Sequence, residues 1–224
     1  MKHIVVLSGA GISAESGIST FRDSNGLWEN HRIEDVASPE GFRKNPKLVL
    51  DFYNLRRAQM HTVAPNDGHI ALGDLEKTHK VTVITQNVDN LHERGGSTNV
   101  VHLHGELLKV RSTRTNEVFE WQNDLNIGDV CPKGAQLRPH IVWFGESVPK
   151  LPLAAEIAAT ADEFWIIGTS MQVYPAAGLI DYIPQDCPVF YIDPQPASIK
   201  HHNLTVIAEN ASTAARRLVN IAQK

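Results

Sequence analysis

The sequence predicts an α/β fold, a doubly wound parallel sheet that carries a smaller lobe formed by two insertions. Short apolar segments rich in β-branched residues alternate along the chain with segments of helical periodicity. This alternation is typical of parallel strands joined by crossover helices. The first apolar segment runs directly into Ser-Gly-Ala-Gly and the start of a helix. That layout is the one found at phosphate-binding turns.

Six segments are predicted to be strands covered on both faces, because each is short and apolar throughout. They span residues 3–7, 81–85, 100–103, 164–167, 189–192 and 204–207. Helical patterns lie at residues 12–17, 68–78, 153–160, 176–182 and 211–223. This order of strands and helices favours a Rossmann-like sheet with helices on both faces.

Two polar stretches do not fit the alternation. Residues 20–67 contain a loop at 22–30 and a helical segment at 46–61 but no clear strand, and residues 108–135 are rich in turn-forming residues. With 224 residues the chain is long enough for one domain with an insert. We therefore expect a single domain over residues 1–224, with the sheet in 1–19, 68–107 and 136–224 and the small lobe in 20–67 and 108–135.

The composition is that of a folded globular chain. Apolar residues make up 42% and charged residues 21%, which excludes a mainly disordered protein. The net charge of −4 argues against a nucleic-acid binder driven by bulk charge. The longest apolar runs, such as 4–7 and 164–167, are far too short to span a membrane. The first residues lack the features of a secretory signal, so we expect a cytoplasmic protein.

Only two cysteines occur, Cys131 and Cys187, and no Cys-x-x-Cys motif is present. A cytoplasmic location disfavours a disulfide between them. Two cysteines without that motif cannot form a cysteine zinc knuckle.

The first motif that bears on chemistry is the glycine-rich turn, which reads Gly-Ala-Gly-Ile-Ser-Ala-Glu-Ser-Gly over residues 9–17. Glycine permits close backbone approach, and the free N–H groups at a helix start attract a pyrophosphate. Ala14 stands where the dinucleotide fingerprint has its third glycine, and no acidic residue closes a second strand about 20 residues later. A plain dehydrogenase is therefore disfavoured, and a simple strand-to-helix turn is the alternative.

The second motif is Thr-Gln-Asn-Val-Asp-Asn at residues 85–90, directly after a predicted strand. Ligands of open α/β sheets bind beyond the carboxyl ends of the strands, where amide and carboxylate groups can orient a ribose or an amide. A polar turn with an aspartate helix cap is the alternative.

The third motif is His-Leu-His-Gly-Glu at residues 102–106, at the end of another strand. Alternation sends His102 and His104 to the same face. A histidine at a strand end is a candidate general base, and a structural or solvated histidine is the alternative. His-x-His could also hold a metal, but no third and fourth ligands lie at a nearby spacing.

These three motifs, followed by Pro-His-Ile-Val-Trp-Phe-Gly-Glu at 139–146 and Gly-Thr-Ser at 168–170, together resemble the sirtuin family of NAD-dependent protein deacylases. The likeness extends from about residue 5 to 175 and is closest to small bacterial sirtuins. It implies acyl-lysine proteins or peptides as substrates and NAD as the co-substrate, with release of nicotinamide and O-acyl-ADP-ribose.

The resemblance also implies roles for individual residues. His104 would be the general base, taking a proton from the ribose hydroxyls, and Val142, Phe144, Gly145 and Glu146 would line the groove for an extended peptide. Asp193 stands near the place where the family usually has an asparagine for the adenosine ribose, and Ala211 is a weaker adenine contact. The full set expected to bind NAD is Gly9, Ala10, Gly11, Ile12, Ser13, Glu15, Ser16, Gly17, Thr20, Phe21, Arg22, Trp28, Gln86, Asn87, Asp89, Gly168, Thr169, Ser170, Asp193 and Ala211.

One segment indicates which acyl group is removed. Tyr53 and Arg56 are three residues apart on a helical pattern, so they share a face and could clamp a carboxylate. The pair resembles the one that marks sirtuins acting on succinyl- or malonyl-lysine, and Ala37 matches the small residue that leaves room for the longer chain. Such sirtuins also remove acetyl groups. The alternative is an exposed arginine beside a tyrosine packed in the lobe.

Most sirtuins hold a structural zinc with four cysteines, and here only Cys131 remains in that stretch. We therefore expect NAD as the cofactor and no structural zinc. We also expect a monomer that binds neither nucleic acid nor membrane. Two other functions stay open: an NAD- or ADP-ribose-binding module without deacylase activity, and a protein ADP-ribosyltransferase.

Overall fold

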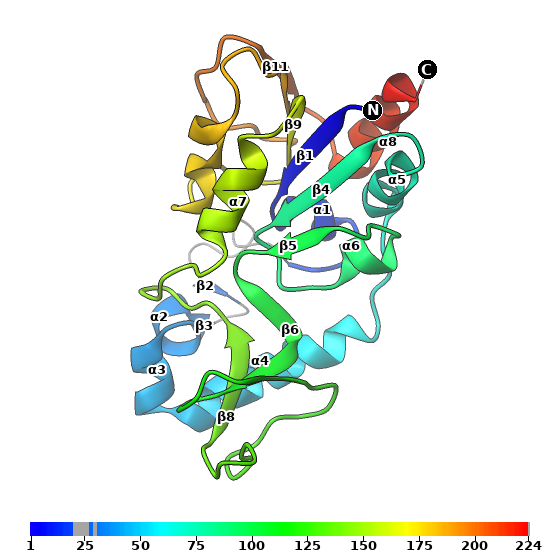
Figure 1. Cartoon of the computed structure of the whole chain (residues 1–224). Coiled ribbons are helices and arrows are strands. Elements are labelled where there is room, and N and C mark those ends of the chain that lie inside the picture. Colours follow the sequence, from blue (N-terminus) through cyan, green and yellow to red (C-terminus); the bar gives the residue numbers. More distant parts are fainter. Residues whose placement is uncertain (20–26, 29–30, 224) are drawn as a thin grey trace. The chain divides into compact units, whose positions relative to one another are not determined.

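The computed structural model describes residues 1–19, 27–28 and 31–223, with residues 27–28 described by their backbone alone. The chain divides into two compact units (Figure 1). The first unit comprises Met1–Ile18, Ala64–Leu103 and Val148–Lys224, and the second comprises Ser19–Val63 and His104–Ser147.

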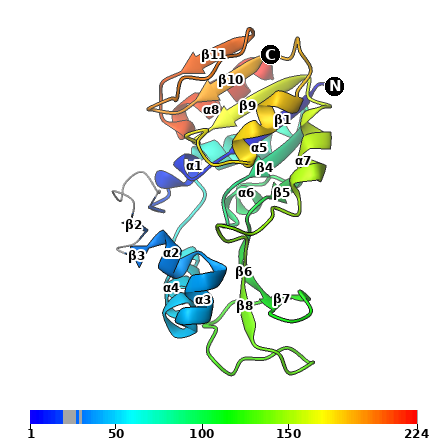
Figure 2. The same ribbon diagram turned by 90° about the vertical axis from the view of Figure 1, so that its left-hand side faces the viewer.

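The first unit contains a six-stranded sheet in which every neighbouring pair is parallel. Numbered along the chain, the strand order is 3-2-1-4-5-6, which is the Rossmann order. Across the sheet, as Figure 2 shows, the strands are β11 (Leu204–Ile207), β10 (Val189–Ile192), β9 (Glu163–Ile167), β1 (His3–Ser8), β4 (Lys80–Thr85) and β5 (Val100–His102).

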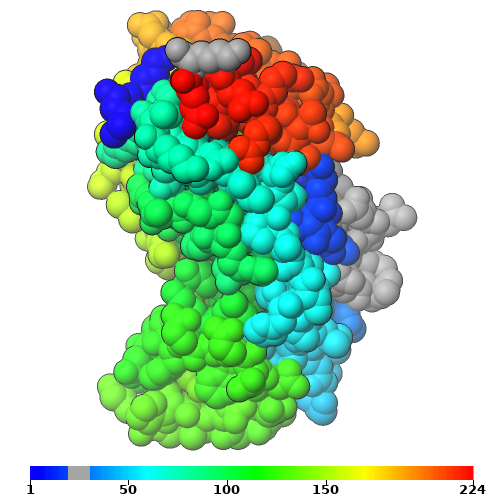
Figure 3. Space-filling model, turned by 90° about the vertical axis from the view of Figure 1, so that its right-hand side faces the viewer, coloured from blue at the N-terminus to red at the C-terminus, as the bar shows by residue number. Residues whose placement is uncertain are grey.

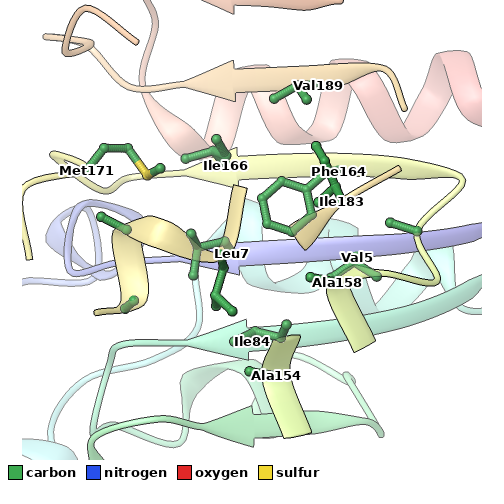
Figure 4. Packing of buried hydrophobic residues seen from close by; sticks show 14 of the residues in the cluster. Val5, Leu7, Ile84, Ala154, Ala158, Phe164, Ile166, Met171, Ile183 and Val189 are labelled. Carbon is green, nitrogen blue, oxygen red and sulfur yellow. The ribbon is translucent and has the colours of Figure 1, made fainter. Parts of the chain in front are cut away.

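Helices cover both faces of this sheet. The side chains of β1 alternate between the faces, and Val5 and Leu7 pack with α7 (Leu151–Ala158) and η2 (Ala176–Tyr182), a 3₁₀ helix (Figure 4). Ile4 and Val6 pack with α5 (Asp67–Leu75) and α8 (Ala211–Ala222), which lie side by side on the face seen in Figure 3. The remaining helices of this unit are short, α1 (Gly11–Ala14) and α6 (Leu91–Arg94).

The second unit combines helices with two small antiparallel sheets. Its helices are α2 (Ile33–Val36), α3 (Pro39–Lys44) and α4 (Pro46–Met60). Ser38 and Asn45 cap α3 and α4 by accepting backbone N–H groups, and proline follows each cap at the first helical position. β2 (Leu27–Trp28) pairs antiparallel with β3 (His31–Arg32), and the larger sheet has the order β7 (Val118–Glu120), β6 (Gly105–Ser112) and β8 (Leu137–Ile141).

The predicted fold class is confirmed, and each of the six predicted strands exists with ends that move by one residue at most. The second unit differs from the predicted lobe, because it also contains residues 19, 104–107 and 136–147 and does not contain residues 64–67. Segments 104–107 and 136–147 carry the start of β6 and all of β8, which pair with each other. The prediction of no clear strand in residues 20–67 missed β2 and β3, which have two residues each. Within the described residues, no helix has the length and apolar character needed to cross a membrane.

Candidate functional site

In the first unit, several residues predicted to bind NAD directly follow the carboxyl ends of the parallel strands. Gly9 follows β1, Gln86 follows β4, Gly168 follows β9 and Asp193 follows β10. Because the strands are parallel, these ends lie along one edge of the sheet. The chain order reverses between β1 and β9, and ligands of doubly wound sheets bind at such a switch point.

Three glycines pack the turn after β1 against the turn after β9. A Cβ at Gly9 would lie 2.7 Å from the Cβ of Thr169, and one at Gly11 would lie 2.7 Å from the Cα of Gly168. Gly168 has a φ of +63°, and a Cβ there would lie 2.3 Å from the backbone nitrogen of Ile12. The backbone N–H of Gly11 donates to the Gly168 carbonyl at 2.8 Å. Backbone packing alone therefore requires glycine at all three positions.

Ser13 lies at the centre of a buried polar cluster beside this turn. Its hydroxyl donates to Asp89 Oδ2 at 3.0 Å and accepts from Asn87 Nδ2 at 3.1 Å. The other carboxylate oxygen of Asp89 accepts the backbone N–H of Leu91 at 3.1 Å. Burial raises the pKa of Asp89, and its two hydrogen bonds oppose that shift. The structure therefore brings Ser13 together with Asn87 and Asp89, which lie 74 and 76 residues further along the chain.

A second layer of buried histidines lies against this cluster. The ring centroids of His69 and His92 are 4.9 Å apart, and neither side chain is exposed. His69 Nδ1 accepts the backbone N–H of Asn66 in a capping box, so the proton of the neutral ring sits on Nε2, 3.4 Å from Ser13 Oγ. Burial lowers the pKa of His69 to about 4 and that of His92 well below 6.5. Both rings are therefore neutral at neutral pH.

Several other predicted NAD residues make side-chain hydrogen bonds within the first unit. Glu15 accepts hydrogen bonds from the hydroxyl and backbone N–H of Ser212 at 2.5 and 3.1 Å, and Ser16 Oγ accepts from Asn66 Nδ2 at 3.0 Å. Gln86 Nε2 donates to Thr169 Oγ1 at 3.0 Å.

The remaining predicted NAD residues differ in burial, and some of them lie outside the described residues. Ile12 and Ala211 are buried in the apolar core, and Asp193 Oδ1 accepts the backbone N–H of Gln195 at 2.8 Å. Ala10 and Ser170 are half-buried, and Gly17 is exposed with a φ of +92°. Thr20, Phe21, Arg22 and the side chain of Trp28 lie outside the described residues.

The residues present at this edge fit NAD. Asn90 follows Asp89 directly, and its Oδ1 is buried without a hydrogen-bond donor among the described residues. A buried acceptor without a donor destabilises a fold, and the ribose hydroxyls and carboxamide of NAD are donors of the required kind. The carboxylate of Asp89 and the amide of Asn87 add acceptors and donors beside it.

In the second unit, His104 immediately precedes β6, and its carbonyl accepts the backbone N–H of Val142 at 2.9 Å. Gly105 has a φ of +86°, and a Cβ there would lie 1.9 Å from the carbonyl oxygen of His140. No other residue type fits at position 105 without moving β6 from β8. The glycine after the candidate base thus fixes the backbone on which His104 is carried.

The residues predicted to bind the acyl-lysine come together in this same unit. The carbonyl of Ala37, which is buried, accepts the backbone N–H of Phe144 at 3.0 Å. Tyr53 is fully buried on α4, and its hydroxyl accepts the indole N–H of Trp143 at 3.0 Å. Phe144 is 50% exposed and Gly145 is exposed with a φ of +89°, as expected for a loop that meets a peptide.

The two neighbouring arginines of α4 differ in their contacts. Arg57 is held by the Leu107 carbonyl at 3.2 Å and by Asn54 Oδ1 at 2.7 Å, so it ties the helix to β6. Arg56 is 7% exposed, and its guanidinium carbon lies 5.9 Å from the Phe52 ring centroid. Its charge contributes to the electrostatic environment of Tyr53. The alternative of an exposed arginine at position 56 is therefore wrong, since both arginines are buried.

Glu146, a predicted groove residue, is the centre of an ion-pair network. Its carboxylate accepts from Arg138 at 2.7 and 3.0 Å, from Arg111 at 3.0 Å and from the backbone N–H of Trp143 at 2.8 Å. Burial opposes ionisation, but these donors hold the pKa of Glu146 below its usual value. We conclude that the carboxylate shapes the loop around Phe144.

The zinc tetrad of most sirtuins has no counterpart, because the chain has two cysteines and they belong to different units. Both are free thiols. The Sγ of Cys131 donates to Ser112 Oγ at 3.3 Å, and this oxygen also accepts the backbone N–H groups of Arg114 and Thr115 at 3.3 and 3.2 Å. Hydrogen bonds to Ser112 thereby join the segment at Cys131 to the turn at residues 112–115.

Sequence reasoning missed His69, His92 and Trp143. Each is buried and makes at least one contact with a residue far away in the chain, as in the 90-residue separation of Trp143 from Tyr53. No local pattern marks such a contact. The spacing of Tyr53 and Arg56, by contrast, was visible in the sequence because both lie on one helix.

Comparisons with known proteins agree with this arrangement. The model of the Sir2 family matches residues 9–175. An NAD-dependent protein deacylase of Helicobacter pylori strain J99 is 55% identical over 221 residues, covering 98% of this chain and 94% of the relative. One from Bacteroides thetaiotaomicron is 51% identical over 226 residues, covering 97% of each. The crystal structure of a Sir2 homologue in complex with NAD has a TM-score of 0.90 at 39% identity, covering 99% of this chain and 90% of that one.

Proposed function

Because the chain belongs to the Sir2 family and is an NAD-dependent protein deacylase, we propose that it removes succinyl and malonyl groups from lysine in addition to acetyl groups. A succinyl or malonyl group differs from acetyl by a terminal carboxylate. The substrate specificity therefore depends on what faces that carboxylate in the second unit.

The observation that carries this proposal is the buried pair of Tyr53 and Arg56 on one face of α4. A carboxylate is the best-matched ligand of a guanidinium, which can donate two parallel hydrogen bonds to it. Tyr53 adds a phenol O–H, and burial raises the pKa of this phenol, so it stays protonated. The side chain of Ala37 is only a methyl group, and the carbonyl of this residue accepts the backbone N–H of Phe144.

We assign the NAD contacts to the cluster of Ser13, Asn87 and Asp89 and to the turns around Gly9 and Gly168. When bound, NAD supplies the ribose carbon that receives the acyl oxygen, and nicotinamide and O-acyl-ADP-ribose are the products. Asp89 and Asn87, held by Ser13, orient the ribose and the carboxamide. The close-packed glycine turns keep side chains away from the phosphates.

We assign the role of general base to His104, which takes a proton from a ribose hydroxyl. An imidazole titrates near neutral pH and suits this step. His104→Ala is expected to abolish turnover while NAD still binds. Turnover comparable to that of the wild type would exclude His104 from this role.

The test is nicotinamide release from NAD, measured by mass spectrometry with succinyl-lysine and acetyl-lysine peptides of the same sequence. Loss of one charge-assisted pair predicts that Arg56→Met lowers kcat/KM for the succinyl peptide by about 10- to 100-fold, with little change for the acetyl peptide. Arg43→Met, a change at an exposed arginine on α3, is the matched control. If the wild type turns over only the acetyl peptide, the enzyme is an ordinary deacetylase. A succinyl rate in Arg56→Met equal to that of the wild type would exclude Arg56 from binding the carboxylate.

If NAD binds but neither peptide reacts, the chain is a binding module instead. We further propose that it acts as a monomer on cytoplasmic proteins and does not bind nucleic acid. Two free, buried thiols suit a reducing compartment, and the net charge of −4 disfavours a polyanion.

A further inference from the structure

Trp143 makes several contacts near the residues proposed to bind the acyl group. Its backbone N–H donates to Glu146 Oε2 at 2.8 Å, and its indole N–H donates to Tyr53 Oη at 3.0 Å. The guanidinium carbon of Arg138 lies 3.3 Å from the centroid of the indole ring, and the Phe42 ring packs 5.3 Å away. The side chain is 2% exposed. Its position is therefore fixed from several directions, and the indole has little freedom to turn.

The residues on either side of Trp143 connect it to the rest of the proposed site. The N–H of Val142 donates to the carbonyl of His104, and the N–H of Phe144 donates to the carbonyl of Ala37. Trp143 thus lies between the backbone that carries the base and the backbone that borders the acyl chain. The loop is anchored on both sides of the indole.

The direction of the hydrogen bond to Tyr53 has a chemical consequence. An indole N–H can only donate, so the oxygen of Tyr53 is the acceptor and Trp143 fixes where that oxygen lies. Burial raises the pKa of Tyr53, which keeps the phenol protonated. A phenol oriented in this way is suited to an acceptor such as a carboxylate.

From this geometry we propose that Trp143 is a positioning residue for acyl specificity, which orients the Tyr53 hydroxyl toward the carboxylate of a succinyl or malonyl group. The inference rests on the proposed function. Trp143 acts through Tyr53 and is not itself a ligand of the acyl carboxylate. Because an acetyl group has no carboxylate, loss of the indole N–H is expected to leave turnover of the acetyl peptide unchanged.

The test is Trp143→Phe, which keeps an aromatic ring between Arg138 and Phe42 but removes the N–H. The loss of one neutral hydrogen bond predicts a KM for the succinyl peptide about fivefold higher, with kcat and the acetyl kinetics unchanged. Trp143→His restores a ring N–H and is expected to recover part of the succinyl activity. Trp121→Phe removes another indole N–H of the same unit, one that donates to the Asp124 carbonyl, and is the matched control.

A double-mutant cycle with Tyr53→Phe separates positioning from packing. If the indole acts through the phenol, Trp143→Phe adds nothing in the Tyr53→Phe background. The role of Trp143 would be overturned if Trp143→Phe lowers kcat/KM equally for both peptides, or if it has its full effect in the Tyr53→Phe background. A selective loss of succinyl turnover in Arg56→Met would still support the proposed function in that case. Absence of succinyl turnover in the wild type would overturn the proposed function itself. Should Trp143→Phe fail to fold, Trp143→Met, which also lacks the ring N–H, replaces it in the same comparison.

Discussion

His69 makes the stability of the chain sensitive to acid in a way that one substitution should remove. Burial lowers its pKa from 6.5 to about 4, so between these values the unfolded chain binds a proton that the folded chain does not. The stabilising contribution is therefore complete above pH 6.5 and is lost as the pH falls toward 4. Protonation would also remove the Nδ1 acceptor of the capping bond to Asn66.

The size of the effect follows from the two pKa values. At pH 5 the linkage relation gives a loss of about 2 kcal/mol relative to pH 7, a large part of the stability of an ordinary domain. His69→Gln removes the titration and keeps a capping-box acceptor at the same helical position. The variant should therefore lose about 2 kcal/mol less than the wild type between pH 7 and pH 5.

Urea unfolding followed by tryptophan fluorescence at both pH values measures this difference. His202→Gln, a change at an exposed histidine of the same unit, is the control and should follow the wild type. Groups that do not contact His69 contribute equally to both chains and cancel in the comparison. If His69→Gln and the wild type lose equal free energy on acidification, the assignment of acid sensitivity to His69 is refuted.

Three further predictions concern the second unit. Gly105→Ala places a Cβ 1.9 Å from the carbonyl oxygen of His140, and the left-handed backbone costs a further ~1–2 kcal/mol. Turnover of the acetyl peptide should therefore fall at least about tenfold. A kcat equal to that of the wild type would contradict the predicted clash. Ser112→Ala leaves two backbone N–H groups without their acceptor and should lower the free energy of unfolding by about 1–3 kcal/mol. A chelator, by contrast, should leave the melting temperature of the wild type unchanged. One zinc per chain found by elemental analysis would disprove the expectation of a zinc-free unit. Glu146→Gln removes the charge shared by Arg138 and Arg111 and should destabilise the chain by about 3 kcal/mol in chemical denaturation; because the pKa of Glu146 is lowered, the wild type itself should lose this contribution as the pH falls below about 4.5.

The sheet was predictable from the sequence because its strands are covered on both faces. Val5 and Leu7 face one core cluster while Ile4 and Val6 face the other, so the strand is an unbroken apolar run. The sheet of the second unit lacks this signal. In β6 buried positions alternate with Glu106, Lys109 and other half-exposed residues, and β8 contains Pro139, which is normally absent from inner strands.

The candidate site was predictable only where its residues are neighbours in the chain. Tyr53 and Arg56 share a helix face, so their spacing indicated a common role. The contact of Trp143 with Tyr53 and that of Ser13 with Asp89 depend on tertiary packing, for which a single sequence carries no local pattern. The burial of Arg57 likewise depends on the Leu107 carbonyl, which β6 brings to α4.

The strand order of the sheet also determines when each unit can be completed on the ribosome. The central strand β1 pairs with β4 and with β9, and β9 is synthesised only after residue 162. The second unit ends at Ser147, so all of its residues have been made before the second neighbour of β1 exists. Nascent chains released at residue 147 would therefore contain every segment of the second unit but a first unit that lacks three of its six strands. Folding during synthesis would therefore complete the second unit first, and one edge of β1 would stay unpaired until the C-terminal third of the chain has been made.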